Sequence, residues 1–238
     1  MFETTRRDGI VQTRCEGARW LSTAWDGGYR EADAVYNVSV PTGFDRTDLD
    51  AYRDERLSEV GFPSGPTLLT GVEMSHARCA TSGPVTVLAT AGLSNPAVLP
   101  VADSGDVGEQ DHDAADRTDR AAPWRPGTVN LVVGVDRALA DGGLATLLGT
   151  VVEAKAATLL AVSDAPGTTS DAVLVGADPA AERATFAGSA TEVGAAARAC
   201  VRDAVLASLD ARYDDGPPTF EAAQYGVVTD RQTDVHTL

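Results

Sequence analysis

The stretch TVNLVVGVDRALADGGLATLLGTVVEAKAATLLAVS, residues 128–163, decides the fold. It opens with a nearly continuous apolar run over 128–136, which is typical of a buried β-strand. A long helical pattern follows over 137–163, with a break expected near Gly149. A helix of this length that follows a buried strand has to cover an apolar face of the sheet. The stretch therefore predicts a β-sheet packed against helices.

Four further short runs have the apolar and β-branched composition of strands and are bounded by Gly, Pro, Ser and Asp. They cover residues 34–40, 67–74, 85–92 and 171–177. A second helix is predicted over 190–212, where Ser189 and Glu192 have the spacing of a capping box and one helix face is apolar. Early strands followed by later helices predict an α+β fold, with a mixed β-sheet packed against helices in a single domain.

We expect this domain to cover residues 1–213. Within it, residues 101–126 are acidic, poor in apolar side chains and broken by Gly and Pro, which predicts an exposed loop. The sequence DDGPP, which begins at Asp214, ends the preceding helix. Residues 214–238 are therefore predicted to form a C-terminal extension, with one edge strand around YGVVT.

The composition describes an acidic, salt-adapted protein. The formal net charge is −16 and only one of the 19 basic residues is a lysine. Such a surface repels nucleic acid and anionic membranes, and its self-repulsion is best tolerated where concentrated salt screens it. We therefore expect a halophilic, cytoplasmic protein with no nucleic-acid or membrane partner. A homo-oligomer is compatible with the sequence.

Targeting and metal-binding signals are missing from the sequence as well. The arginines near the start have no apolar run behind them, and no stretch approaches the about 18 consecutive apolar residues of a membrane span. Cys15, Cys79 and Cys200 have neither the spacing of a zinc site nor that of a disulfide framework. The sequence therefore predicts a reduced environment and no metal.

The single lysine, Lys155, lies inside an apolar pattern. At about 100° per residue it shares one arc of the helix with four apolar residues. These residues are Leu148, Val152, Leu159 and Val162. Glu153 points almost the opposite way, so it cannot be the ion-pair partner. An unpaired ammonium in apolar surroundings costs several kcal/mol, so another part of the molecule must supply a partner. Asp171, Glu73 and a bound ligand are the candidates; alternatively, the side chain extends from the edge of the stripe to water.

Four segments, in this order, resemble the motif series of the CbiZ-type adenosylcobinamide amidohydrolases. They are ATAGLSNPAVLP (89–100), GTVNLVVGV (127–135), VVEAKAATLL (151–160) and GTTSDAVLVGA (167–177). Segments 19–28, 67–77 and 188–209 also resemble that family, so the resemblance covers about residues 15–212. Two departures stand out: PGTTSD occurs where the family usually has TGTGTD, and Val152 stands where a threonine is common. Hydroxyl and backbone contacts at those points differ from the family pattern.

The resemblance implies a hydrolase that cleaves the amide joining the aminopropanol arm of adenosylcobinamide to the corrin ring. The product, adenosylcobyric acid, re-enters coenzyme B12 synthesis. The corrinoid is then the substrate, and no cofactor is expected. An alternative is a non-catalytic corrinoid-binding or chaperone protein, which the altered PGTTSD segment favours. A third reading, an acidic interaction domain, leaves a lysine and an asparagine inside apolar patterns unexplained.

Amide hydrolysis needs an activated nucleophile, stabilisation of the oxyanion and a proton for the leaving amine. The chain has no GxSxG or HExxH motif, and His76 is more simply explained as a structural histidine, so a carboxylate with a lysine is the economical arrangement. We expect Glu153 or Asp171 to act as general base on water. Lys155 is expected to stabilise the oxyanion or to donate the proton.

Five polar residues in the resembling segments are expected to bind the substrate: Ser94, Asn95, Thr128, Asn130 and Ser170. Asn130 is the most telling of them, because asparagine is depleted in strands and a buried amide has to be hydrogen-bonded. Asn95 and Ser170 are also explained by turn structure. Ser94 and Thr128 are candidate nucleophiles, ranked below activated water because the sequence sets no base beside them.

Overall fold

The structure, a computed structural model, describes residues 1–100, 127–218, 226–229 and 231–237. Three α-helices and twelve strands lie in these ranges. In chain order the elements are β1 (Glu3–Arg7), β2 (Ile10–Arg14), β3 (Arg19–Ser22), β4 (Gly28–Glu31), β5 (Ala34–Ser39), α1 (Leu49–Glu59), β6 (Thr67–Thr70), a 3₁₀ turn η1 (Met74–His76), β7 (Arg78–Ser82), β8 (Val85–Ala91), β9 (Ala97–Val98), β10 (Val129–Val135), α2 (Asp141–Ser163), β11 (Ala172–Ala177), α3 (Glu192–Arg212) and β12 (Val227–Val228). The expected α+β fold is confirmed.

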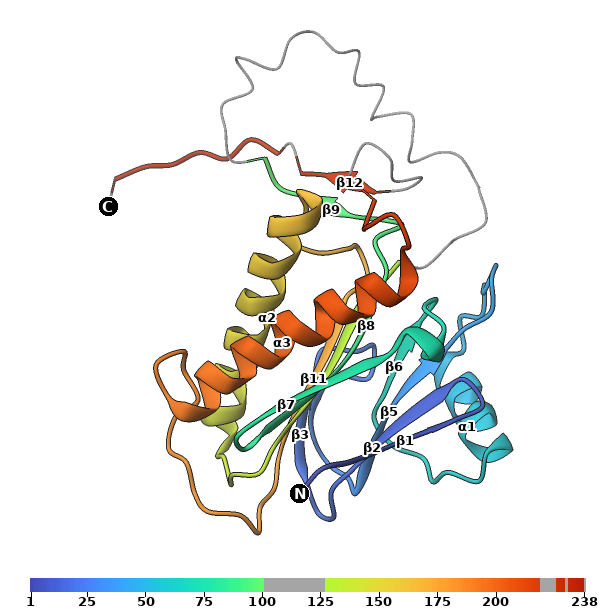
Figure 1. Cartoon of the computed structure of the whole chain (residues 1–238), viewed down its shortest axis with the longest axis vertical. Coiled ribbons are helices and arrows are strands. Elements are labelled where there is room, and N and C mark those ends of the chain that lie inside the picture. The colour runs from blue at the N-terminus through green and yellow to red at the C-terminus, as the bar shows by residue number, and fades with distance from the viewer. Residues whose placement is uncertain (101–126, 219–225, 230, 238) are drawn as a thin grey trace, which may run out of the picture.

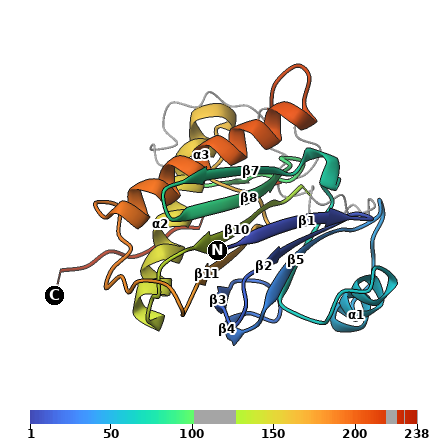
Figure 2. The same ribbon diagram turned by 60° about the horizontal axis from the view of Figure 1, so that its bottom comes forward.

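Two sheets and three helices stack in layers (Figures 1 and 2). The larger sheet has six strands in the order β4-β3-β11-β10-β8-β7, and α2 and α3 cover one of its faces. The smaller sheet, in the order β1-β2-β5-β6, packs on the opposite face, and α1 covers its outer side. The larger sheet is mixed, because β10 and β11 are parallel while β8 and β3 run antiparallel to them.

Strand β10 lies at the centre of this stack and is buried along its whole length. Leu131 and Val133 point to the helices, whereas Val132 points to the smaller sheet. A Cβ at Gly134 would come within 2.3 Å of the Phe2 ring, so only glycine fits there. Burial on both faces explains why this strand reads as a continuous apolar run rather than as an alternating pattern.

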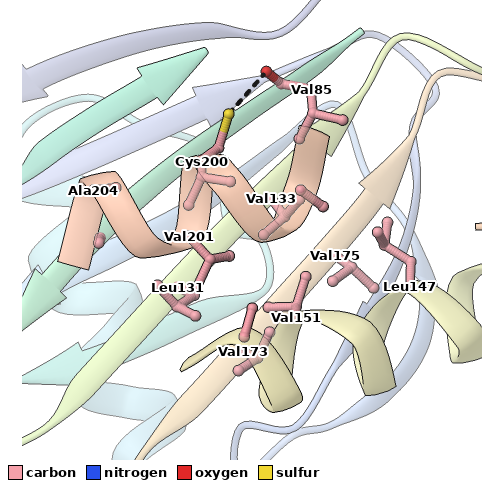
Figure 3. Packing of buried hydrophobic residues seen from close by; sticks show 14 of the residues in the cluster. Val85, Leu131, Val133, Leu147, Val151, Val173, Val175, Cys200, Val201 and Ala204 are labelled. Carbon is pink, nitrogen blue, oxygen red and sulfur yellow. Dashed lines mark hydrogen bonds between the residues drawn. The ribbon is translucent and has the colours of Figure 1, made fainter. Parts of the chain in front are cut away.

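Helices α2 and α3 bury their apolar faces on the larger sheet. Figure 3 shows Cys200 and Val201 of α3 beside the strands, with the Cys200 thiol 4.0 Å from the carbonyl oxygen of Val85. Leu147 and Val151 of α2 belong to the same core. Burial raises the pKa of the Cys200 thiol, which makes this cysteine an inert core residue. All three cysteines are free, as expected.

Helix α2 begins at Asp141 rather than near residue 137, and it differs from its prediction in two further ways. It runs unbroken through Gly149, which is exposed and has open space where a Cβ would be. Its buried face includes Leu144, Leu147 and Val151, while Val152 of the predicted stripe is 41% exposed. Apolar residues lie almost all round this helix, so their spacing does not define one face. By length and composition α2 could also cross a membrane, but here it packs on the sheet and α3.

Other boundaries were predicted less well. The strand expected over 67–74 ends at Thr70 and is followed by η1. The N-cap of α3 is Thr191, not Ser189, because the Thr191 hydroxyl accepts the Gly194 amide at 3.0 Å. Strands β1 to β4, β7 and helix α1 had no sequence-based prediction. The strands expected over 34–40, 85–92, 128–136 and 171–177 are confirmed to within about a residue.

The C-terminal segment returns as the expected edge strand, although on a separate small sheet. Strand β12 pairs in parallel with β9, with the Val227 amide donating to the carbonyl of Pro96 and the Thr229 amide to that of Val98, each at 2.9 Å. The predicted acidic loop at 101–126 lies outside the described residues. The domain boundary after residue 213 stays a prediction.

Candidate functional site

Three chain segments meet at one edge of the larger sheet. Because β10 and β11 are parallel and β8 is antiparallel to β10, the end of β8 and the starts of β10 and β11 lie together. The segments after β8 and before β11 are joined directly, since the Thr169 amide donates to the Asn95 carbonyl at 3.1 Å. The Ala97 amide donates to the Gly167 carbonyl at 2.9 Å. The motifs singled out in the sequence therefore meet at this edge.

Lys155 reaches this edge from α2 and forms an ion pair with Asp171. Of the candidate partners that the sequence left open, the structure pairs Lys155 with this aspartate. The two side chains retain 9% and 11% of their accessible surface. The charges are therefore largely withdrawn from water, and their attraction is screened less than that of a surface pair.

The Asp171 carboxylate accepts four hydrogen bonds. Oδ1 accepts from the Val129 amide at 2.8 Å and from the Thr168 hydroxyl. Oδ2 accepts from the Thr168 amide at 3.1 Å and from the Lys155 ammonium. A carboxylate has about four lone-pair positions, so Asp171 has none left for a further donor. It ties β10, β11 and α2 together at one point.

Two glycines make this convergence sterically possible. A Cβ at Gly167 would lie 2.6 Å from Asp171 Oδ2 and 2.8 Å from Lys155 Nζ. A Cβ at Gly127 would lie 2.2 Å from the amide nitrogen of Ser94. The glycine-rich turns were expected to let the backbone approach a ligand; in the structure these two glycines let segments of the protein approach one another.

Asn95 and Ser170 carry enclosed polar atoms at this edge. Asn95 is 5% exposed, and its Nδ2 donates to the Thr169 hydroxyl at 2.5 Å. Within the described part of the chain, Asn95 Oδ1 and Ser170 Oγ have no hydrogen-bond partner. Native proteins leave few buried polar atoms unpaired, so such atoms need an explanation. Ser94 is half-buried and packs against Gly127.

Thr128 and Asn130 lie deeper, between the two sheets. The Thr128 hydroxyl is 2.8 Å from that of Thr70, and both residues are almost fully buried. Asn130 is fully buried, and its Nδ2 donates to Asn37 Oδ1 at 3.0 Å and to the Leu69 carbonyl at 2.9 Å. Both amide protons of Asn130 are thus used within the protein, whereas its Oδ1 has no hydrogen-bond partner among the described residues.

This buried network includes residues that the sequence reasoning missed. Asn37 of β5 also donates to the Thr90 hydroxyl of β8, at 2.9 Å. Asn37 stands inside the apolar run AVYNVSV, so the signal that drew attention to Asn130 was present there too. Thr90 gave no signal, since threonine is common in strands.

Glu153 and His76 do not join the cluster. The Glu153 side chain is 70% exposed, and its nearest cation is Arg198 of α3 at 3.8 Å. His76 Nδ1 lies 2.7 Å from the carbonyl oxygen of Ala211, and its own carbonyl accepts the Ser208 hydroxyl at 2.9 Å. The histidine therefore links η1 to the end of α3, as expected of a structural residue.

The arrangement combines one fixed cation with enclosed amide and hydroxyl groups. A preorganised ammonium in water-poor surroundings can stabilise negative charge that develops on a carbonyl oxygen. The unpaired oxygens of Asn95 and Ser170 are of the type that accepts the N–H groups of carboxamides, and both atoms are buried in this structure. The chemistry at this edge of the sheet suits a reaction of an amide.

The family model and the sequence relative agree with this chemistry. The family model described as adenosylcobinamide amidohydrolase matches residues 1–217. A Halobacterium salinarum protein named adenosylcobinamide amidohydrolase is 50% identical over 239 residues, which cover 99% of this chain and 99% of that protein. Among solved structures, the PH0078 protein of Pyrococcus horikoshii OT3 aligns with a TM-score of 0.41 and 11% identity, over 87% of this chain and 78% of that one.

Proposed function

The chain belongs to the adenosylcobinamide amidohydrolase family, and from this premise we propose that the cluster around Lys155 and Asp171 is where the substrate amide is cleaved. The protein is a hydrolase that acts on adenosylcobinamide in corrinoid salvage. The alternative of a non-catalytic corrinoid-binding protein is not favoured. The acidic composition agrees with the halophilic source of the relative.

The observation that carries the proposed site is the ion pair itself. Lys155 is held at a sheet edge with 9% of its side-chain surface accessible, so its ammonium is fixed, and we propose that the substrate carbonyl reaches it there. In the reaction a water oxygen bonds to the amide carbon, and the carbonyl oxygen becomes negative. Lys155 stabilises this oxyanion. One proton of that water passes to the amide nitrogen as the C–N bond breaks, so aminopropanol leaves as the amine and the acid remains on the corrinoid.

Asp171 is better suited to holding Lys155 than to activating water. Its four acceptor positions are all occupied by protein donors, so a water molecule would have to displace one of them. Glu153, the other candidate base, lies on the exposed side of α2. We therefore assign to Asp171 the orientation of the ammonium.

The enclosed oxygens beside the ion pair are proposed to bind the substrate. Asn95 Oδ1 is an acceptor and Ser170 Oγ can donate or accept, so both suit the carboxamide groups that surround a corrin ring. The side chains of Thr128 and Asn130 form hydrogen bonds between the two sheets. We propose that they support the site and do not contact the substrate. For the cell compartment we propose the cytoplasm, which the free cysteines support.

The test is a product assay. Purified protein in molar salt is incubated with adenosylcobinamide, and adenosylcobyric acid is measured by chromatography together with a binding titration. The function predicts product, with turnover that Lys155→Met removes while the corrinoid is still bound. Binding without product in the unmodified protein would instead indicate a corrinoid-binding protein.

A further inference from the structure

We propose that Thr168 is a positioning residue, whose hydroxyl fixes the Asp171 carboxylate so that it holds the Lys155 ammonium in its working position. This inference rests on the proposed function of the Lys155 cluster. Thr168 supplies two of the four donors to Asp171, one from its hydroxyl to Oδ1 and one from its amide to Oδ2. It therefore contacts both carboxylate oxygens.

The hydroxyl decides the rotation of the carboxylate. The terminal torsion of an aspartate has a broad, roughly two-fold energy profile, so neighbouring donors set its angle. Oδ1 is held by the Val129 amide and the Thr168 hydroxyl, while Oδ2 is held by the Thr168 amide and carries Lys155. Without the hydroxyl, a single backbone amide would remain on each oxygen. The carboxylate plane would then be held less firmly, and a turn of that plane would move the ammonium.

The position of the Lys155 ammonium depends strongly on the Asp171 carboxylate. A lysine ends in a point charge on a flexible four-carbon stem, so its nitrogen goes where its partner is. Asp171 is the one carboxylate that contacts it within the described ranges. An oxyanion stabiliser that moves by about 1 Å loses on the order of 100-fold in rate.

Thr168 is itself held firmly, which makes it a useful anchor. It is 8% exposed and forms an antiparallel bridge with Pro96. On either side of it, the Thr169 amide donates to the Asn95 carbonyl and the Gly167 carbonyl accepts the Ala97 amide. The position of the carboxylate is thus fixed by the same pairing that joins the segments after β8 and before β11.

The kinetic test compares three variants. Thr168→Val keeps the shape but removes the hydroxyl, and we expect kcat to fall about 10-fold to 100-fold while KM changes by less than about 3-fold. Thr168→Ser restores the hydroxyl and should keep kcat within about 3-fold of the unmodified enzyme. Thr146→Val is the matched control, because the Thr146 hydroxyl only bonds the Gly142 carbonyl on the exposed side of α2.

A second test does not depend on activity. Because Lys155 is the only lysine, labelling with 15N-lysine gives a single Nζ signal in the NMR spectrum. Thr168→Val should shift or broaden that signal, whereas Thr168→Ser and Thr146→Val should leave it nearly unchanged. If Thr168→Val does not fold, as judged by circular dichroism, Thr168→Ala replaces it in both tests.

An unchanged Nζ signal in the valine variant would overturn the positioning role, whatever happens to turnover. A shifted signal with unchanged kcat would also overturn it, because the position of the ammonium would then not matter for the reaction. If the unmodified protein makes no product at all, the proposed function fails, and the NMR comparison still tests whether Thr168 holds Lys155.

Discussion

Lys155 and Asp171 form an ion pair across 16 residues of chain, and the backbone of Gly167 lies directly against both charged groups. The pair is thus enclosed by the segment that carries the aspartate. Breaking such an enclosed pair by removing one partner is expected to destabilise the fold, because the other charge remains in water-poor surroundings. Activity and stability therefore have to be measured together at this site.

Lys155→Met should lower kcat by about 100-fold to 1,000-fold, since it removes the charge that stabilises the oxyanion and keeps the apolar stem. Lys155→Arg keeps the charge, but a guanidinium is wider than an ammonium and meets Gly167, so we expect partial activity. Product formation in molar salt checks both variants, with melting curves to confirm folding. Wild-type kcat in Lys155→Met would remove this lysine from the mechanism.

Glu153→Gln should leave kcat within about 2-fold of the unmodified enzyme, and its melting temperature should hardly change, because exposed ion pairs contribute about 0–1 kcal/mol. Arg198→Gln, which removes the other partner of the same pair, is the matched control. The same product assay is the measurement. A large loss in Glu153→Gln but not in Arg198→Gln would restore this glutamate as a candidate base.

Gly167→Ala should abolish most activity, because the added methyl group would have to displace either the ammonium or the carboxylate. Gly149→Ala is the control, because an added methyl group at that position meets no other atom within 4 Å. That glycine lies in the interior of α2 with open space around it, so alanine should stabilise the fold by about 0.5–1 kcal/mol without affecting turnover. Thermal unfolding and the product assay on both variants give the comparison. Full activity of Gly167→Ala would contradict the close contact.

Asn37→Ala should lower the free energy of unfolding by about 1–3 kcal/mol, since it leaves buried groups of Asn130 and Thr90 without their partner. Denaturant unfolding at constant salt measures the change. Replacing both Asn37 and Asn130 by leucine should lower the free energy of unfolding by less than the sum of the two single replacements. Each single variant leaves the amide of the other asparagine unpaired, whereas the double variant removes both amides. Strict additivity would argue against one shared network.

Arg46→Gln should make the protein less stable near neutral pH but not in acid. Its guanidinium bonds Asp48 and Glu55 beside α1 and lowers the pKa of both carboxyl groups. A lowered folded-state pKa stabilises the fold above the unfolded pKa, near 4, and this contribution disappears as the pH falls through the folded-state value. The difference in melting temperature between the two proteins should therefore be present at pH 7 and shrink below about pH 4. A difference that does not depend on pH would contradict the role of these carboxyl groups.

The sequence could name the partner of Lys155 among its candidates because few groups were available to pair with the ammonium. A lone ammonium in an apolar pattern needs a carboxylate from another segment, and Asp171 was one of few candidates. The exact face of α2 could not be anticipated, because Val152 and Leu160 continue the apolar character onto the exposed side. The break expected at Gly149 was wrong because tertiary packing on both flanks of that residue carries the helix through it.

Strand β1 of the smaller sheet escaped prediction for a different reason, although β5 and β6 of that sheet were predicted. Strand β1 is exposed along its whole length and rich in charge, so it has no apolar alternation for a sequence pattern to detect. The polar network between the sheets depends on the contact of Asn37 with Asn130, which are 93 residues apart. Local sequence shows that each amide is unusual, but only the tertiary structure shows that the two amides meet.

The pairing of β12 with β9 has a practical consequence for expression and comparison. The family match ends at residue 217, ten residues before this strand begins, whereas the Halobacterium salinarum relative aligns over 99% of the chain. A shortened gene that stops at the family limit would leave the carbonyls of Pro96 and Val98 without their cross-strand donors, and Pro96 directly follows Asn95. Recombinant protein should therefore retain residues 218–238, and an affinity tag should follow them through a flexible linker.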